Sequence, residues 1–209
     1  MIDIPSNLEI VVVGNKRKKI ITTDFLKGIP HRVFYTTDYD LPEGFQIAPQ
    51  YRKYKSACDN VLGAYRCFRG HQDAIASCTK ENILVFEDDA SVDNQEWLKV
   101  LPAALEMLKD FEIVSLHGRG AKMKRFHNKA QGVYSFYQSK KAGECWVLGA
   151  LAYMLKSNTS NKICGSKYVG NPLDLYICND FSFCFLNPSP FIHDRKEGSL
   201  IEDIGPIAP

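Results

Sequence analysis

The sequence predicts an α/β fold, a single Rossmann-like domain in which helices flank a central mixed, mainly parallel sheet. Residues 83–86 are continuously apolar, as expected for a strand buried on both faces of such a sheet. Residues 7–14 form another apolar, β-branched run that is closed by a glycine. Residues 56–80 lie between these runs and have the character of a helix that leads into the later strand. This order of strand, helix and strand favours the α/β class.

Three adjacent carboxylates, Glu87, Asp88 and Asp89, follow the apolar run directly. In an open α/β sheet the carboxyl end of a strand lies at the edge where ligands bind. Crowded carboxylates repel one another, and a divalent cation that also binds a nucleotide diphosphate would relieve this repulsion. The alternative is a solvated acidic turn in which Asp88 or Asp89 caps the next helix. On the residues alone, both interpretations remain open.

Length and bulk charge limit the classes of function. The chain of 209 residues fits one domain, and its 45% hydrophobic and 24% charged residues are typical of a globular protein. A net charge of +2 favours neither a nucleic acid nor a membrane surface as partner. No apolar stretch reaches transmembrane length. These values leave a globular enzyme or binding domain as the expectation.

The cysteines and the chain ends suggest a compartment. The chain has seven cysteines, an odd number, and none of them forms a C-x-x-C pair. We therefore expect reduced thiols and a cytoplasmic location. If the protein is viral, this would be the cytoplasm of the host. Residues 1–5 lack the basic, apolar start of a signal peptide. Residues 205–209 resemble a linker, which predicts a domain cut from a longer chain with further domains after it.

The remaining elements follow from local patterns. A basic turn, residues 15–19, follows the first strand and either suits a diphosphate or is a solvated loop. A second helix should open at Ser91 and carry an apolar stripe into the core. The basic segment 119–141 is either a mobile loop over an active site or a solvated surface. Further strands are expected at residues 31–37, 112–118, 133–137, 144–155 and 181–186, with a short helix at 158–163.

One face of the helix at residues 56–80 carries functional candidates. Gly63, Cys67 and His71 are four residues apart and therefore share that face. Arg66, Arg69 and His71 are candidates for holding phosphate. The alternative is that His71 is a hydrogen-bonded packing residue and that the arginines are surface charges.

These residues carry a family resemblance. Residues 63–71, with Cys67 and His71 in order, precede a strand that ends in Glu-Asp-Asp, and this arrangement resembles glycosyltransferase family 25, the lipooligosaccharide and collagen galactosyltransferase group. Gly70 stands where the family has serine, and Arg66 and Arg69 also depart from its pattern. Later segments match in order: residues 149–153, 172–174 and 190–199. The compact length and basic first loop also resemble the amino-terminal glycosyltransferase domains of chlorovirus proteins that decorate the capsid.

The resemblance implies a GT-A fold with a nucleotide-binding half at about 1–118 and an acceptor half at about 119–204. It implies metal-dependent transfer of a hexose-type sugar from a nucleotide-diphosphate donor, a UDP-sugar, to a glycan or glycoprotein hydroxyl, with inversion. Mn²⁺ or Mg²⁺ would neutralise the departing diphosphate as a Lewis acid. Asp89 is the first candidate for a direct ligand, and a nitrogen from His193 would favour Mn²⁺.

Further roles follow from strand order. Glu87 or Asp88 would bind the donor ribose or a metal-bound water, and Glu87 is also a metal-ligand candidate. Three residues at the end of the first strand would line the nucleobase pocket, and Lys16, Arg66 and His71 would lie near the diphosphate. The three nucleobase candidates are Val12, Val13 and Gly14.

Inversion requires a carboxylate that deprotonates the acceptor hydroxyl. Asp174 is the candidate, because its loop matches a late P-x-D position of the family, and capping of the following helix is its structural alternative. Asp180 and Glu144 are alternative bases. Two other classes use the same acids: a metal-dependent phosphoryl or nucleotidyl transferase, and a non-catalytic domain that binds a nucleotide sugar.

Overall fold

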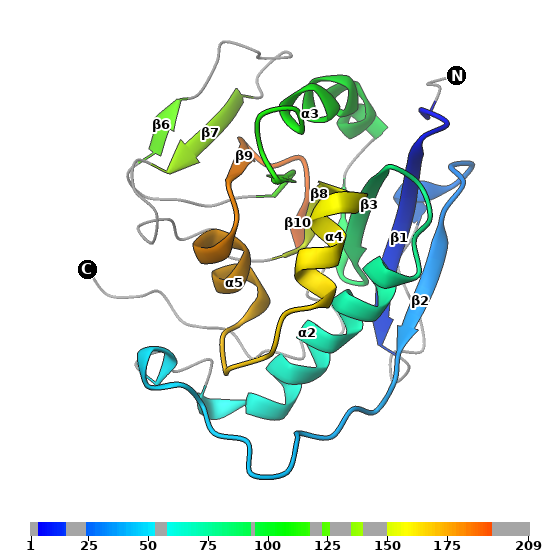
Figure 1. The fold of residues 1–209 in the computed structure, drawn as a ribbon. Coiled ribbons are helices and arrows are strands. Elements are labelled where there is room, and N and C mark those ends of the chain that lie inside the picture. Colours follow the sequence, from blue (N-terminus) through cyan, green and yellow to red (C-terminus); the bar gives the residue numbers. More distant parts are fainter. Residues whose placement is uncertain are drawn as a thin grey trace.

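The structure, a computed structural model, describes residues 4–15, 24–52, 58–92, 95–117, 123–125, 135–139 and 150–193. An eight-stranded sheet with the order β2-β1-β3-β8-β5-β9-β7-β6 forms its centre, and helices cover it (Figure 1). The strands of this sheet are β1 (Leu8–Asn15), β2 (Arg32–Thr36), β3 (Asn82–Glu87), β5 (Ile113–Ser115), β6 (Met123–Arg125), β7 (Ser135–Ser139), β8 (Ala152–Lys156) and β9 (Phe183–Asn187). The helices are α2 (Val61–Ala76), α3 (Leu101–Met107), α4 (Ser157–Cys164) and α5 (Leu173–Asp180), with short 3₁₀ turns η1 (Asp24–Leu26), η2 (Pro49–Tyr51) and η3 (Gln95–Val100).

The strand directions confirm the predicted fold class. β1 pairs in parallel with both β2 and β3, and β5 pairs in parallel with β9. Strand β8 runs antiparallel to its neighbours β3 and β5, and β7 runs antiparallel to β9 and β6. Six of these eight strands therefore run in one direction, and only β8 and β7 are reversed. The sheet is mixed but mainly parallel, as expected for an α/β protein with helices on its faces.

Two hydrophobic clusters lie on opposite faces of the sheet. In β1, Ile10 and Val12 belong to one cluster, and Val11 and Val13 belong to the other, because successive strand side chains point to opposite faces. The first cluster includes the buried residues of α3, and the second includes buried apolar residues of α2, α4 and α5. This arrangement explains why strands β1 and β3 read as continuous apolar runs in the sequence.

Helix α2 is shorter than the predicted span of residues 56–80. It begins after Asn60, whose side chain accepts a hydrogen bond from the backbone N–H of Gly63 at 2.9 Å. Such a cap satisfies one of the unpaired donors of the first helical turn. The helix ends at Ala76, and Ser77 closes it. The sequence located the helix but not its first turn, since a cap is recognised only once the helix start is known.

The expected helix opening at Ser91 is wrong. Residues Ala90–Ser91 form a short strand, β4, that pairs antiparallel with β10 (Ile192–His193). The helical segment starts later, with η3, and continues into α3. A proline suits the first turn of α3, because the first N–H groups of a helix have no partner within the helix and proline lacks this group. The apolar stripe lies in the core as predicted, with Trp97, Leu98 and Leu101 buried. Because Ser91 pairs with Ile192, the turn at Asp88 and Asp89 leads into a short strand and not into a helix.

Several predictions fall on residues outside the described ranges, namely the basic turn after β1, most of the segment 119–141 and the first part of the run at 144–155. Among the described residues, no helix combines the length and the apolar character needed to cross a bilayer. Each remaining predicted strand overlaps a strand of the sheet, and the short helix predicted at 158–163 lies within α4.

Helix α2 approaches the sheet closely at Gly70. A Cβ atom at this position would lie 2.2 Å from Cγ2 of Thr36 and 3.5 Å from Cγ1 of Val13. The first distance is far inside van der Waals contact, so any side chain here would push the helix away from β1 and β2. The close packing therefore gives a physical reason for glycine at a position where the family pattern has serine.

We expect Gly70→Ala to lower the free energy of unfolding by about 1 kcal/mol. Overpacking costs about 1–3 kcal/mol, and the better helix propensity of alanine offsets about 1 kcal/mol of that. The measurement is urea denaturation followed by circular dichroism. Thr36→Ser removes the methyl group that the new Cβ would meet, so the loss should shrink in the Thr36→Ser background. A loss of the same size in both backgrounds would contradict the steric explanation.

Candidate functional site

The three adjacent acids lie at the carboxyl end of β3. Glu87 is the last residue of that strand and pairs with Val13 of β1, while Asp88 and Asp89 form the turn into β4. All three side chains are half-buried. The prediction that these acids directly follow a central strand of the sheet is confirmed. Their role in binding a ligand stays a prediction.

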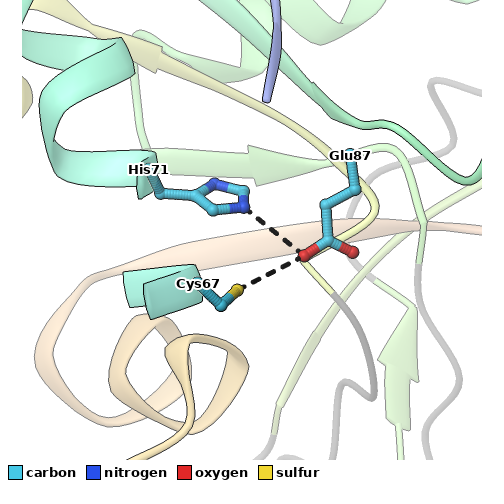
Figure 2. A group of neighbouring side chains, drawn as sticks. All are labelled: Cys67, His71 and Glu87. Carbon is cyan, nitrogen blue, oxygen red and sulfur yellow. Dashed lines mark hydrogen bonds and ion pairs between the residues drawn. The ribbon is translucent and has the colours of Figure 1, made fainter. Parts of the chain in front are cut away.

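Strand alternation decides where Glu87 points. Val85 belongs to the cluster on the α2 face of the sheet, and Glu87, two residues later, projects to the same face. There its Oε1 atom lies 3.4 Å from Nε2 of His71 and accepts a hydrogen bond from the Cys67 thiol at 3.7 Å (Figure 2). Cys67 and His71 do share one face of α2, as their four-residue spacing predicts, and this face meets the end of β3.

His71 is held by a second partner behind it. Its side chain is only 1% exposed, and its Nδ1 atom shares a 2.7 Å hydrogen bond with the hydroxyl of Tyr153 from β8. The two rings are stacked, with centroids 5.8 Å apart and planes at 19°. Tyr153 pairs with Val85 in the sheet, which explains why it reaches the same face. These contacts match the hydrogen-bonded packing interpretation of His71, and its role in donor binding stays a prediction.

Negative charge gathers around Cys67. Burial raises the pKa of the Cys67 thiol well above its usual value, and the carboxylates of Glu87, Asp174 and Asp89 raise it further. Burial likewise raises the pKa of Tyr153, with Glu87 as the next cause. Without a bound metal ion, both groups therefore keep their protons at neutral pH. The charges of three carboxylates from different elements therefore affect this one thiol.

Asp174 lies in the first turn of α5, half-buried, and its Oδ1 accepts a hydrogen bond from the backbone N–H of Leu175 at 2.9 Å. Helix α2, which carries Cys67 and His71, contacts α5, the helix that carries this acid. The alternative base Asp180 is exposed at the opposite end of the same helix, where its carbonyl accepts from Lys162. Glu144 is outside the described residues. Of the described candidates, Asp174 is the one whose charge affects Cys67, as the charges of Glu87 and Asp89 do.

His193 joins the site through its backbone. In the β4–β10 pair, His193 is the partner of Ala90, the residue directly after Asp89. A late segment of the chain therefore returns to the acids, as the proposed set of Asp89, Glu87 and His193 requires. The side chain of His193 is outside the described part of the structure.

The other donor-site candidates have varied surroundings. Val12 and Val13 are buried in the two opposite cores, and Gly14 is buried beside β2, so the end of β1 offers mainly its backbone. The Nε atom of Arg66 donates to the Tyr39 carbonyl at 3.0 Å, which fixes the loop after β2. Lys16 is outside the described residues. The donor-binding roles of these residues stay predictions.

Sequence reasoning gave no role to Tyr153, which the structure identifies as the partner that orients His71. It noted the tyrosine only as part of a segment that matches the family. The available signal was a single aromatic residue with a hydroxyl in an otherwise apolar strand, since a buried hydroxyl needs a hydrogen-bond partner.

Comparison with known proteins adds three distant structures. No protein-family model and no curated protein matches the chain. A197 from STIV shares 11% identity, with 88% of this chain and 83% of that chain covered, at a TM-score of 0.40. TarS 1–349 from S. aureus shares 11%, covering 88% and 59%, at 0.42. HddC from Yersinia pseudotuberculosis shares 9%, covering 85% and 88%, at 0.41. Likenesses this low carry no argument about activity, so the functional proposal rests on the chain's own residues.

We expect Tyr153→Phe to lower the free energy of unfolding by about 1–3 kcal/mol, because it leaves a buried nitrogen of His71 without its partner. Chemical denaturation of the two proteins measures this loss. Tyr168→Phe is the matched control, since its half-buried hydroxyl is 3.5 Å from the Val61 carbonyl and should contribute about 0.5 kcal/mol or less. Equal losses for the two variants would remove the special role of the His71–Tyr153 bond.

Proposed function

We propose that this chain is a metal-dependent glycosyltransferase of the GT-A type that transfers a hexose-type sugar from a UDP-sugar to a hydroxyl of a glycan or glycoprotein, with inversion. The gathering of carboxylates at the carboxyl end of β3 is the observation that carries the proposal. Glu87 ends β3, and Asp88 and Asp89 form the half-buried turn that follows it. The charges of Glu87, Asp89 and Asp174 all raise the pKa of the half-buried Cys67 thiol. A divalent cation would relieve the repulsion between neighbouring carboxylates, and the edge of an open α/β sheet is the usual place for a nucleotide.

The donor set suits Mn²⁺ or Mg²⁺. Half-buried carboxylate oxygens are hard ligands, which both ions prefer, and a histidine nitrogen would favour Mn²⁺. Asp89 is the proposed direct ligand, supported by the backbone pairing that brings His193 beside it. Because Oε1 of Glu87 is already in contact with His71 and Cys67, Asp88 is the better-placed acid to assist Asp89. When bound, the ion would neutralise the charge that develops on the departing diphosphate.

The chain's own residues have separate tasks in this proposal. Asp174 would accept the proton of the acceptor hydroxyl as that oxygen attacks the anomeric carbon. The backbone at Val12, Val13 and Gly14 would lie along the nucleobase, and Lys16 and Arg66 would face the diphosphate. The acceptor itself would bind in the half formed by residues 119–204. The family 25 and chlorovirus resemblances are consistent with this division and stay predictions.

We expect UDP to bind in the presence of Mn²⁺ and to bind at least about tenfold more weakly when the metal is chelated. Asp89→Asn should remove this dependence on Mn²⁺, as measured by isothermal titration calorimetry. Asp110→Asn is the control, because this exposed acid precedes β5 and so lies at the opposite edge of the sheet. Metal-dependent binding that persists unchanged in Asp89→Asn would overturn the assignment of Asp89.

Asp174→Asn should keep the affinity for UDP and Mn²⁺ and lower the rate of sugar transfer by about 10²–10⁴-fold, the usual contribution of a general base. A thermal-shift screen with Mn²⁺ and a panel of nucleotide sugars identifies the donor, because a ligand that binds the folded state raises its melting temperature. Transfer from that donor to candidate acceptors is then followed by product analysis. Asp180→Asn, an exposed acid at the far end of the same helix, should transfer normally.

The products also separate the alternative functions. A glycoside or free sugar together with UDP supports the proposal. An altered nucleotide phosphate would indicate a phosphoryl or nucleotidyl transferase. Binding of a nucleotide sugar without any product would indicate a non-catalytic domain.

A further inference from the structure

Three potential ligand atoms converge on the α2 face of β3. They are Sγ of Cys67, Nε2 of His71 and a carboxylate oxygen of Glu87, and all lie within 4.8 Å of one another. Two come from successive turns of one helix and the third from a strand end, so rigid elements hold them (Figure 2). Among the described residues this is the group with the composition and spacing of a metal site.

Two of the three ligand separations are close to those of tetrahedral coordination. Zinc binds sulfur at about 2.3 Å and nitrogen or oxygen at about 2.0–2.1 Å, which sets ligand separations of roughly 3.4 Å for nitrogen to oxygen and about 3.6 Å for sulfur to oxygen. The structure has 3.4 Å between His71 Nε2 and Glu87 Oε1, and 3.7 Å between Cys67 Sγ and the same oxygen. The third separation, from Cys67 Sγ to His71 Nε2, is within 4.8 Å, so these two side chains would approach each other as the ion binds.

We propose that Cys67, His71 and Glu87 form a zinc site that is separate from the nucleotide-associated cation at Asp89. Thiolate sulfur is a ligand that zinc prefers and that Mn²⁺ and Mg²⁺ do not, so the two sites select different ions. Three protein ligands leave the fourth position of zinc to a water molecule. The side chain of Glu87 is 21% exposed, which gives the ion a route to an otherwise buried place.

The surroundings supply what a zinc site needs beyond its ligands. Tyr153 contacts the Nδ1 atom of His71, the ring nitrogen opposite the proposed ligand atom, at 2.7 Å. A hydrogen bond of this kind fixes the ring orientation and the tautomer of a ligating histidine. The charges of Asp174 and Asp89 also reach Cys67 and favour a cation there. The bound ion would join α2 to β3 and hold Glu87 turned toward the helix.

Cobalt provides a direct test, because Co²⁺ occupies zinc sites and a thiolate ligand gives it a sulfur-to-cobalt charge-transfer band in the near ultraviolet. The protein is stripped with a chelator under reducing conditions and titrated with CoCl₂, and ZnCl₂ is then added in competition. We expect one equivalent of Co²⁺ to produce the band and one equivalent of Zn²⁺ to remove it. Zn²⁺ should also raise the melting temperature of the stripped protein.

Variants assign the ligands. Cys67→Ser should abolish the band, and His71→Gln and Glu87→Gln should each weaken cobalt binding strongly. Tyr153→Phe should weaken it by about 10–100-fold, the usual effect of losing an outer partner. Cys164→Ser is the matched control, because this half-buried cysteine near α2 donates to the Gln72 carbonyl instead. It should keep the band.

The wild-type titration decides the proposal even where a variant fails to fold. A stripped protein that is folded by circular dichroism but gives no charge-transfer band would overturn it, and so would a band that survives in Cys67→Ser. Asp89→Asn separates this site from the proposed function. It should keep the cobalt band while it loses Mn²⁺-dependent binding of UDP, so either proposal can fail without the other.

Discussion

The crowding of carboxylates at the carboxyl end of β3 is the constraint on which the rest of the site depends. Glu87, Asp89 and Asp174 come from different elements and still act on one sulfur atom, Cys67. Each negative charge raises the free energy of its neighbours, so such an arrangement needs hydrogen-bond donors, bound cations or both. On the α2 side the thiol of Cys67 and the imidazole of His71 contact Glu87. On the side of the β3–β4 turn, Asp88 and Asp89 are the acids that a nucleotide-bound cation would contact.

The close approach of α2 to the sheet makes this arrangement possible. Gly70 has no side chain to hold the helix away from Thr36, and the next residue, His71, is therefore deep enough to meet Tyr153 and Glu87. Side chains fixed by packing and by a second hydrogen bond lose little entropy when they bind a ligand. The close packing at Gly70 therefore helps to set the position of His71 relative to Tyr153 and Glu87.

The two proposed cation sites share an edge of the sheet but differ in chemistry. Oxygen ligands at Asp88 and Asp89 suit a hard ion that a diphosphate also binds, whereas sulfur and imidazole nitrogen suit zinc. Glu87 stands between them, with Oε1 turned to Cys67 and His71. A fixed Glu87 would keep its charge away from the departing diphosphate and leave Asp89 as the principal contact with the nucleotide-bound ion. The zinc site would then influence which acid contacts the nucleotide-bound cation, without itself contacting the substrate.

The sequence by itself determined the fold class and the position of the acids, because continuous apolar runs and a four-residue helical spacing are local patterns that report burial directly. It also determined that Cys67 and His71 share a face, and strand alternation puts Glu87 on the same side as Val85. Only the tertiary structure decided that Ser91 pairs in a strand, that Tyr153 orients His71, and that His193 returns to Ala90. These contacts join residues far apart in the chain. No local pattern encodes them, since they depend on the order in which the strands assemble and on how closely one helix packs against them.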